Sequence, residues 1–472
     1  MAKLSIKLTI VTFESPYPAP DPRGNPVLTS PAVELLIPRW IAPVVPQGSV
    51  LEKHAIAIQG DRIVALGPVA ELIAAWPDAR QTALPSHLIT PGFVNLHSHA
   101  AMALLRGVGD DLPLQQWLQE RIWPLESQLL SSDFVFDGSV LACAEMLRSG
   151  VTCFNDMYFF PESTVQAAQL FGLRIASAIV ILDFPTPWAG SAEECLRKGL
   201  DLRDRLRSQE RVHFTLGPHA PYSVGDAMLR EVAKLSAELS LPVHMHVHET
   251  SEEVAQSLAQ HGCRPLTRLA KLDVLSPEMI AVHAVHLDDQ DIRLLVEHGV
   301  HVAHCPHSNL KLAAGIAPIA KLSAAGVGIG IGTDGSASNN RLDLLAEART
   351  AAFLVKGTSG DAAGWPAHQT LRNLTLSGAA ALGLESEIGS IEVGKCADLI
   401  AFNFDDPALI PSAADPVAQL IYAGGREHLS EVWLGGEAVV SKRQLNRPAA
   451  VRVLHEVAAR AALWQTSAQY RS

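Results

Sequence analysis

The chain of 472 residues is 48% hydrophobic and has a formal net charge of −12 at pH 7 with its histidines neutral. This length is too great for one ordinary domain and suits a large barrel with a smaller unit beside it. The acidic balance, without any lysine- or arginine-rich run, argues against nucleic acid as the main partner.

Residues 1–31 are predicted to be an extension without regular structure, because six prolines fall between Pro16 and Pro31. The first residues, MAKLSIKLTIVTF, lack the apolar region and cleavage site of a signal peptide. No apolar run further along approaches the length of a membrane span. Six cysteines are scattered without a CxxC pair, which favours a reducing compartment over a disulfide framework or a cysteine-based zinc site. We therefore expect a cytoplasmic protein that does not bind a membrane.

Residues 32–88 are predicted to form a small all-β unit. Val33–Ile37, Trp40–Val45 and His54–Leu66 are strand-like, and the last contains two β-rich runs around Gly60-Asp61, which is typical of a hairpin. Residues 385–445 are β-rich again, and residues 446–472 follow as a predicted terminal helix. We expect the two β-rich stretches to form one composite β-sandwich.

From residue 89 to residue 384, short apolar strands alternate with amphipathic helices. The strand candidates are ITPGFVNLH, VTCFNDM, LRIASAIVI, VHFTLGPH, LPVHMHVHE, MIAVHAVH, VHVAHCPH and VGIGIGTDG. Eight strands with intervening helices in this length predict an α/β fold, a distorted (β/α)8 TIM barrel. A doubly wound open sheet is the structural alternative.

Polar and ionisable residues stand at the carboxyl ends of these strands. A barrel builds its site at that end, from several strands that converge on one axis, whereas an open sheet concentrates its ligand groups near one crevice. The pattern therefore favours the barrel. The residues are His97, His99, Asn155, Asp156, His219, His246, Glu249, His283, His304 and Asp334.

The sequence His97-Ser98-His99 is a candidate start of a metal site. Residues two apart on a strand point to the same face, so both imidazoles can bind one cation. The alternative is two polar residues on a half-exposed strand. With His246 and Asp334, also at strand ends, the pair makes four groups of the kind that zinc accepts, although such a set does not decide between zinc, iron and manganese.

Glu249 follows His246 by three residues, where the strand should turn into a helix. A carboxylate there can exchange a proton with a metal-bound water and a leaving nitrogen. The alternative is an acid that only stabilises a helix N-terminus. His283 and His286, on the next strand, are candidates for a second metal or for polarising the water. The fourth strand, RVHFTLGPHAPY, has no lysine to bridge two metals, which favours a single ion.

Together these motifs resemble those of the amidohydrolase superfamily. The segments PGFVNLHSH, HMHVHET, AVHAVH, HCPHSN, GIGTDG and GSIEVGKCADLIAF occur in that order. Within the superfamily, DDLPLQQWLQERIWPLE, FNDMYF and LGPHAPYS resemble the group of 5′-methylthioadenosine/S-adenosylhomocysteine deaminases. The resemblance implies hydrolytic deamination of a purine nucleoside, one divalent metal ion per subunit, most simply Zn²⁺, and a homo-oligomer.

The resemblance also implies a role for particular residues. His97, His99, His246 and Asp334 match the metal ligands, Glu249 and Asp334 the proton carriers, and His283 the histidine that orients the attacking water. Glu126 and His219 match substrate-binding positions, and Glu249 also contacts the purine ring. Trp117 is taken as a further pocket residue, although Trp117 and Trp123 lie near opposite helical faces and at least one of them is expected only to pack.

The chain departs from the group in the segment ILDFPTPWAGSAEE, which contains no arginine to hold a homocysteine carboxylate. A buried carboxylate without a partner is unfavourable, so methylthioadenosine is favoured over S-adenosylhomocysteine. Adenosine is also kept as a substrate. The alternatives are a deaminase of guanine or another free base, a triazine amino- or chlorohydrolase, and a noncatalytic binding barrel.

Overall fold

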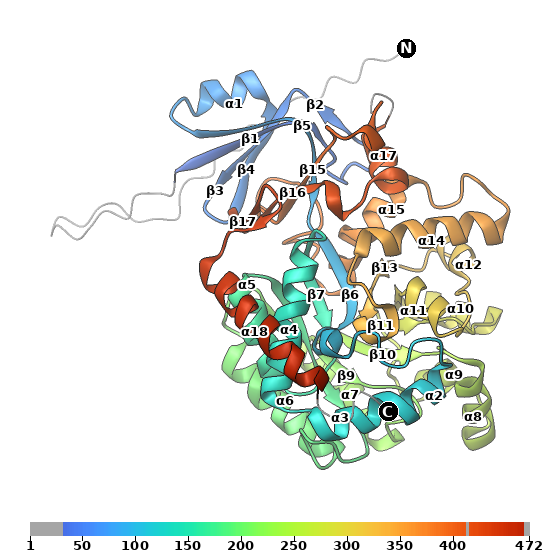
Figure 1. Ribbon diagram of the computed structural model, residues 1–472. Helices are drawn as coiled ribbons and strands as arrows, with labels where there is room; N and C mark the ends of the chain where they lie inside the picture. Colours follow the sequence, from blue (N-terminus) through green and yellow to red (C-terminus); the bar gives the residue numbers. More distant parts are fainter. Residues whose placement is uncertain (1–31, 412–414, 467–472) are drawn as a thin grey trace.

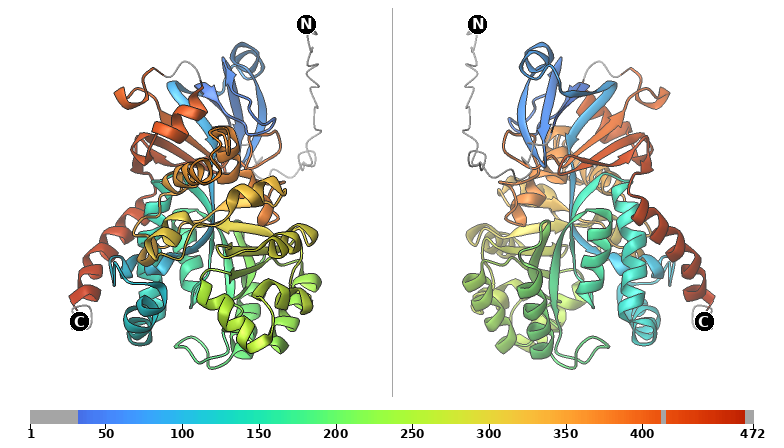
Figure 2. Two further views of the ribbon diagram at one scale, coloured as in Figure 1. Left: turned by 90° about the vertical axis from the view of Figure 1, so that its right-hand side faces the viewer. Right: turned by 90° about the vertical axis from the view of Figure 1, so that its left-hand side faces the viewer.

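The computed structural model describes residues 32–411 and 415–466, so the extension predicted for 1–31 lies outside the described residues. The chain forms a mixed α/β fold with two separate nine-stranded sheets (Figure 1). One sheet comes from the two ends of the described chain and the other from its middle. Of the terminal segment predicted for 446–472, Pro448–Thr466 forms helix α18, which runs along the outside of the molecule in Figure 2, and residues 467–472 lie outside the described residues.

The terminal sheet has the strand order β18-β17-β16-β15-β5-β1-β3-β4, with β2 paired to β1. Antiparallel pairing between β15 and β5 joins the N-terminal strands to the C-terminal ones. Hydrogen bonding therefore makes one continuous sheet, and side chains from both halves, including Ile56, Leu399 and Trp433, share one buried cluster. The strands are β1 (Val33–Ile41), β2 (Leu51–Glu52), β3 (His54–Gln59), β4 (Arg62–Pro68), β5 (Arg80–Pro91), β15 (Leu399–Asn403), β16 (Leu429–Leu434), β17 (Glu437–Ser441) and β18 (Gln444–Leu445).

The central sheet is parallel throughout. Its strands are β6 (Phe93–His99), β7 (Val151–Asp156), β8 (Arg174–Ile181), β9 (Val212–Pro218), β10 (Val243–Val247), β11 (Met279–His283), β12 (His301–His304), β13 (Ile329–Ile331) and β14 (Asp334–Gly335). All eight predicted strands form, the last one as the two short pieces β13 and β14. Strand β13 pairs with β12 and strand β14 pairs with β6, so the two pieces lie at opposite edges of the sheet.

Helices separate the strands of the central sheet, and several begin at side-chain caps that the sequence contains. Ser191 accepts a hydrogen bond from Glu194 N–H at the start of α6, and Thr250 accepts one from Glu253 N–H at the start of α8. The longer helices are α4 (Ser132–Leu147), α5 (Pro161–Phe171), α6 (Ala192–Leu206), α7 (Asp226–Leu239), α8 (Ser251–His261), α10 (Asp289–Glu297), α14 (Leu344–Ser359), α15 (Ala367–Leu374) and α17 (Pro416–Ala423). The shorter ones are α1 (Val69–Ala75), α2 (Leu114–Trp117), α3 (Trp123–Leu129), α9 (Pro265–Lys271), α11 (Pro306–Lys311), α12 (Ile319–Ala324), α13 (Ser336–Asn339) and α16 (Leu376–Ala381).

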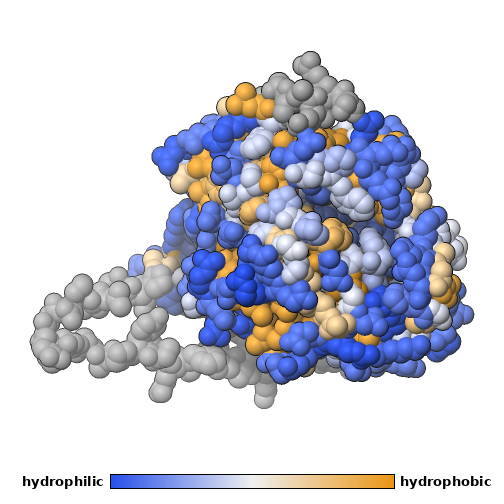
Figure 3. Space-filling view, turned by 90° about the horizontal axis from the view of Figure 1, so that it is seen from below, coloured by the Kyte–Doolittle hydropathy of each residue, from blue (hydrophilic) through white to orange (hydrophobic). Residues whose placement is uncertain are grey.

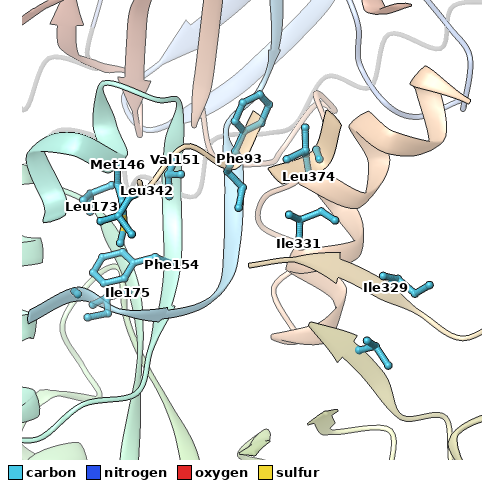
Figure 4. Packing of buried hydrophobic residues seen from close by; sticks show 14 of the residues in the cluster. Phe93, Met146, Val151, Phe154, Leu173, Ile175, Ile329, Ile331, Leu342 and Leu374 are labelled. Carbon is cyan, nitrogen blue, oxygen red and sulfur yellow. The ribbon is translucent and has the colours of Figure 1, made fainter. Parts of the chain in front are cut away.

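Strand β6 leads from the terminal sheet into the buried core of the central one. In Figure 4, Phe93 lies between two groups of apolar side chains, one around Phe154 and the other around Ile331. The residue before it, Gly92, has no room for a side chain, because a Cβ there would lie 2.0 Å from the Thr152 hydroxyl oxygen. This close approach fixes where the chain passes from one sheet to the other.

The carboxyl end of β6 points toward the lower side of Figure 1. Seen from that side, the surface is mostly hydrophilic with smaller hydrophobic patches between the polar residues (Figure 3). Across residues 32–411 and 415–466, no helix combines the length and apolar character needed to cross a membrane.

Candidate active site and metal centre

Strands β6 and β14, which are neighbours in the sheet, bring three predicted metal ligands together. One carboxylate oxygen of Asp334, Oδ1, lies 3.1 Å from His97 Nε2 and 3.2 Å from His99 Nε2. The other oxygen, Oδ2, accepts hydrogen bonds from the hydroxyls of Ser308, at 2.6 Å, and Ser338, at 2.8 Å. The two serine hydroxyls therefore fix the carboxylate through Oδ2, while Oδ1 faces the two imidazoles.

His246, the fourth predicted ligand, reaches the same point from β10. Its Nε2 lies 3.3 Å from Nε2 of His97. Its Nδ1 donates to the carbonyl of His219 at 2.8 Å, and Nδ1 of His99 donates to the carbonyl of Met157 at 2.5 Å. Because Nδ1 donates in both residues, Nε2 is the nitrogen through which His99 and His246 could bind a cation.

The donor set fits a divalent metal. His97, His99 and Asp334 form one group whose ligand atoms lie within 4.8 Å of one another, and His97, His246 and His283 form another. Nitrogen and oxygen donors without sulfur suit zinc but also iron or manganese. His286 lies outside both groups, since its Nε2 donates to the Ala314 carbonyl at 2.7 Å.

Burial sets the charge of these groups. It lowers the pKa of His97 to about 3 and, together with the neighbouring histidines, lowers that of His246 well below its ordinary value. Burial alone would raise the pKa of Asp334, but hydrogen bonds to His97 and His99 hold it well below the usual range. His99 differs, because burial is outweighed by the hydrogen bond and charge of Asp334 together with the Met157 carbonyl and the charge of Asp156, which raise its pKa to about 9. A cation at this point would compete with that proton.

His283 and Glu249 face each other beside this cluster. His283 Nδ1 donates to Asn309 Oδ1 at 2.8 Å, and its Nε2 lies 3.6 Å from a Glu249 carboxylate oxygen. Glu249 is 9% exposed, and burial raises the pKa of its carboxyl group. Burial therefore favours the protonated form of this carboxyl group, which suits a residue that passes a proton to a substrate.

A different acid serves the start of helix α8. The side chain of Glu253 accepts hydrogen bonds from the backbone N–H groups of His248, at 2.9 Å, and Glu249, at 2.8 Å. From the sequence, Glu249 could also have been an acid that only stabilises the helix N-terminus. In the structure Glu253 has that role instead. The sequence gives little sign of this difference, because four consecutive polar or acidic residues follow Glu249.

A cavity of about 340 Å³ opens beside His99. Its wall includes two predicted substrate-binding residues, Glu126 and His219, and is otherwise mainly apolar. Tyr158 donates its hydroxyl to Glu126 at 2.6 Å, and burial raises the pKa of Glu126 to about 7. The lining residues are His99, Met102, Trp123, Glu126, Ser127, Leu130, Met157, Tyr158, Phe159, Val180, Leu182, Phe184, Pro185, Thr186, Pro187, His219, Tyr222 and Ser223.

Trp117 is not among the residues that line this cavity. It is 4% exposed, packs within a buried cluster and donates its indole N–H to the carbonyl of Val108 at 3.0 Å. Trp123, on the other face, lines the cavity instead. The sequence spacing indicated that the two side chains diverge, but only the surrounding packing shows which of them reaches the cavity.

Comparison with known proteins places this chain in a family. The pattern of the Amidohydrolase family matches residues 88–439. The chain belongs to the amidohydrolase family. A pattern described as an imidazolonepropionase-like composite domain of bacteria also matches residues 55–79, in the terminal sheet.

Relatives of this amidohydrolase include proteins named 5-methylthioadenosine/S-adenosylhomocysteine deaminase. One from Teredinibacter turnerae is 45% identical over 426 residues, which cover 90% of this chain and 95% of the relative. Another, from Saccharophagus degradans, is 40% identical over 440 residues, which cover 93% and 98% of the two chains.

Solved structures show the same fold. An adenosine deaminase from Xanthomonas campestris with bound zinc has a TM-score of 0.88 and 43% identity, covering 92% of this amidohydrolase and 99% of that chain. Atrazine chlorohydrolase from Arthrobacter aurescens, complexed with zinc, has a TM-score of 0.85 at 23% identity, covering 91% and 100%. The second likeness shows the fold alone.

Proposed function

We propose that this amidohydrolase hydrolytically deaminates an adenine nucleoside, with 5′-methylthioadenosine preferred, and that its central sheet is a distorted (β/α)8 barrel. The observation behind the proposal is the placement of Glu249 and the His/Asp cluster beside a cavity with Glu126 in its wall. The names of the relatives at 40–45% identity support the same reaction class.

We propose one divalent metal ion, zinc in the simplest case, held by His97, His99, His246 and Asp334. The buried nitrogen and oxygen donors and the zinc in the adenosine deaminase that is 43% identical to this chain support this assignment. When bound, such an ion lowers the pKa of a water molecule and so supplies the attacking nucleophile.

The protein groups then move protons. Glu249, whose pKa burial raises, donates a proton to a ring nitrogen of the adenine and makes C6 more electrophilic. His283 orients the attacking water through the Nε2 atom that faces Glu249. Asp334 accepts a proton from that water, and the proton passes to the amino group, which leaves as ammonia.

The cavity wall supports the choice of nucleoside. In this proposal Glu126 accepts hydrogen bonds from ribose hydroxyls and His219 contacts the purine, and both residues line the cavity. Among the described residues that line the cavity there is no lysine or arginine, while Phe184, Pro185 and Pro187 are apolar. A methylthio group suits this wall better than a homocysteine carboxylate, which would have no cationic partner.

The test is ammonia release by the purified zinc-loaded protein from a panel of methylthioadenosine, S-adenosylhomocysteine, adenosine, guanine and triazines. We expect the highest kcat/KM with methylthioadenosine. Turnover of guanine or a triazine, with none of the three nucleosides, would contradict the proposal. The homo-oligomer and the cytoplasmic location remain proposals, for light scattering and cell fractionation to check.

A further inference from the structure

Glu347 is a completely buried carboxylate on α14 that neither lines the cavity nor belongs to the candidate metal groups. It accepts three hydrogen bonds from nitrogen. The backbone N–H of His307 lies 3.0 Å from Oε2, while His307 Nδ1, at 2.7 Å, and Asn339 Nδ2, at 2.6 Å, bond to Oε1. A buried carboxylate is costly unless such donors surround it, so its position is closely determined.

The hydrogen bonds between Glu347 and His307 connect Glu347 to Asp334 and His283 through helix α11. His307 is followed directly by Ser308, whose hydroxyl donates to Asp334 Oδ2 at 2.6 Å. Asn309 comes next, and its Oδ1 accepts the Nδ1 proton of His283 at 2.8 Å. Any movement of His307 is therefore passed to the side chains that orient two proposed catalytic residues.

The hydrogen bond between Asn339 and Glu347 connects Glu347 to Asp334 through helix α13. The Asn339 amide that donates to Glu347 also donates to the carbonyl of Thr333 at 2.6 Å. Its neighbour Ser338 donates to Asp334 Oδ2 at 2.8 Å. Asp334 has a positive φ of 59°, a strained conformation for a non-glycine residue that persists only where the surroundings hold it.

We propose that Glu347 is a positioning residue, which fixes Asp334 and His283 by clamping α11 to α13. The kinetic test of this inference rests on the proposed function, because it uses the proposed substrate. The metal-binding test does not. Glutamine in place of Glu347 would present an NH₂ group to one of the donors that the carboxylate now accepts. One hydrogen bond would become a donor–donor contact, and the clamp would loosen.

The test compares Glu347→Gln with a matched control, Asp398→Asn. Asp398 is also a buried carboxylate with several donors, since it accepts from Arg174 at 3.3 Å and from Gly435 N–H at 2.7 Å. Asp398 directly precedes β15 of the terminal sheet and contacts Arg174, the first residue of β8, away from the carboxyl ends of the central strands. Both variants should lose thermal stability, because each leaves buried donors without a charged acceptor.

Only Glu347→Gln should change the site. We expect its kcat on methylthioadenosine to fall about tenfold or more with KM nearly unchanged, and its zinc affinity, measured by competition with a chromophoric chelator without substrate, to fall about tenfold. Asp398→Asn should retain kcat and zinc affinity. If wild-type protein proves inactive on the whole panel, the function proposal fails while the zinc measurement still tests Glu347.

Two results would overturn the inference. One is a folded Glu347→Gln protein with wild-type kcat and zinc affinity, and the other is an equal loss of both in Asp398→Asn. If Glu347→Gln does not fold, Thr350→Val replaces it, because the Thr350 hydroxyl bonds to the far nitrogen of His307, Nε2, at 2.7 Å. That variant should lower kcat and zinc affinity in the same direction by a smaller factor, and unchanged values would contradict the proposal.

Discussion

Tyr158 donates its hydroxyl to the carboxylate of Glu126 across 2.6 Å in the wall of the candidate substrate cavity. Burial nevertheless raises the pKa of Glu126 to about 7, with Tyr158 and the charge of His99 opposing the rise. Glu126 therefore changes its charge near neutral pH. Its ionised form is the one that only accepts hydrogen bonds, as ribose hydroxyls require.

The first prediction concerns the pH dependence of KM. Below a pH of about 7, Glu126 takes up a proton and loses acceptor capacity, so KM for methylthioadenosine should rise by up to about tenfold per pH unit. Above that pH, KM should level off. Steady-state kinetics at several pH values measure the change, and Glu126→Gln should raise KM and remove the dependence. A KM that stays constant between acidic and alkaline pH would exclude this role.

The second prediction concerns proton transfer by Glu249. Glu249→Gln keeps the size of the side chain but cannot exchange a proton, so kcat should fall by about 10²- to 10⁴-fold. Zinc content should stay at the wild-type level. The control is Glu252→Gln, an exposed neighbour that bonds to Ser251, and it should keep full activity. Comparable kcat values for Glu249→Gln and wild type would show that another group carries the proton.

The third prediction concerns metal removal. A chelator should abolish ammonia release and lower Tm, because the folded state loses the ion that binds to it and not to the unfolded chain. Zinc at about 1,000 times its Kd would restore roughly 4 kcal/mol of stability. Elemental analysis should find one ion per chain. His286→Ala should retain it, since His286 bonds to the Ala314 carbonyl outside the cluster, whereas a second ion lost in that variant would contradict a single-metal site.

The fourth prediction separates the two tryptophans. Trp123 lines the cavity and is 40% exposed, so Trp123→Ala should raise KM for methylthioadenosine severalfold with little change in Tm. Trp117→Phe should leave KM unchanged and lower the unfolding free energy by about 1–3 kcal/mol, because the Val108 carbonyl loses its buried donor. Kinetics and thermal melts of both variants test this, and a larger KM effect from Trp117 would reverse the assignment.

The sequence by itself determined the strands of the central sheet and most of the proposed metal site. Apolar runs that end in His97, His246 or Asp334 need no long-range information to be recognised, because strand periodicity and ligand chemistry are both local. The same local rule located the strands of the terminal sheet. It predicted two strands, Val33–Ile37 and Trp40–Val45, where the structure has the single strand β1 (Val33–Ile41). That error arose because Pro38 and Arg39 interrupt the apolar pattern, and the register with β5 shifts between Pro38 and Trp40, yet the chain continues as one strand.

Only the tertiary structure decided which polar side chains support these ligands. Glu249 and Glu253 are both acids near the start of α8, yet one faces His283 and the other holds backbone N–H groups. Glu347 lies 40 residues along the chain from His307 and eight from Asn339, and it bonds to both. Such roles depend on the distance between side chains from different elements and on their burial, and neither quantity is encoded in local spacing. The physical reason is that hydrogen bonds act over about 3 Å in space, whatever the separation along the chain.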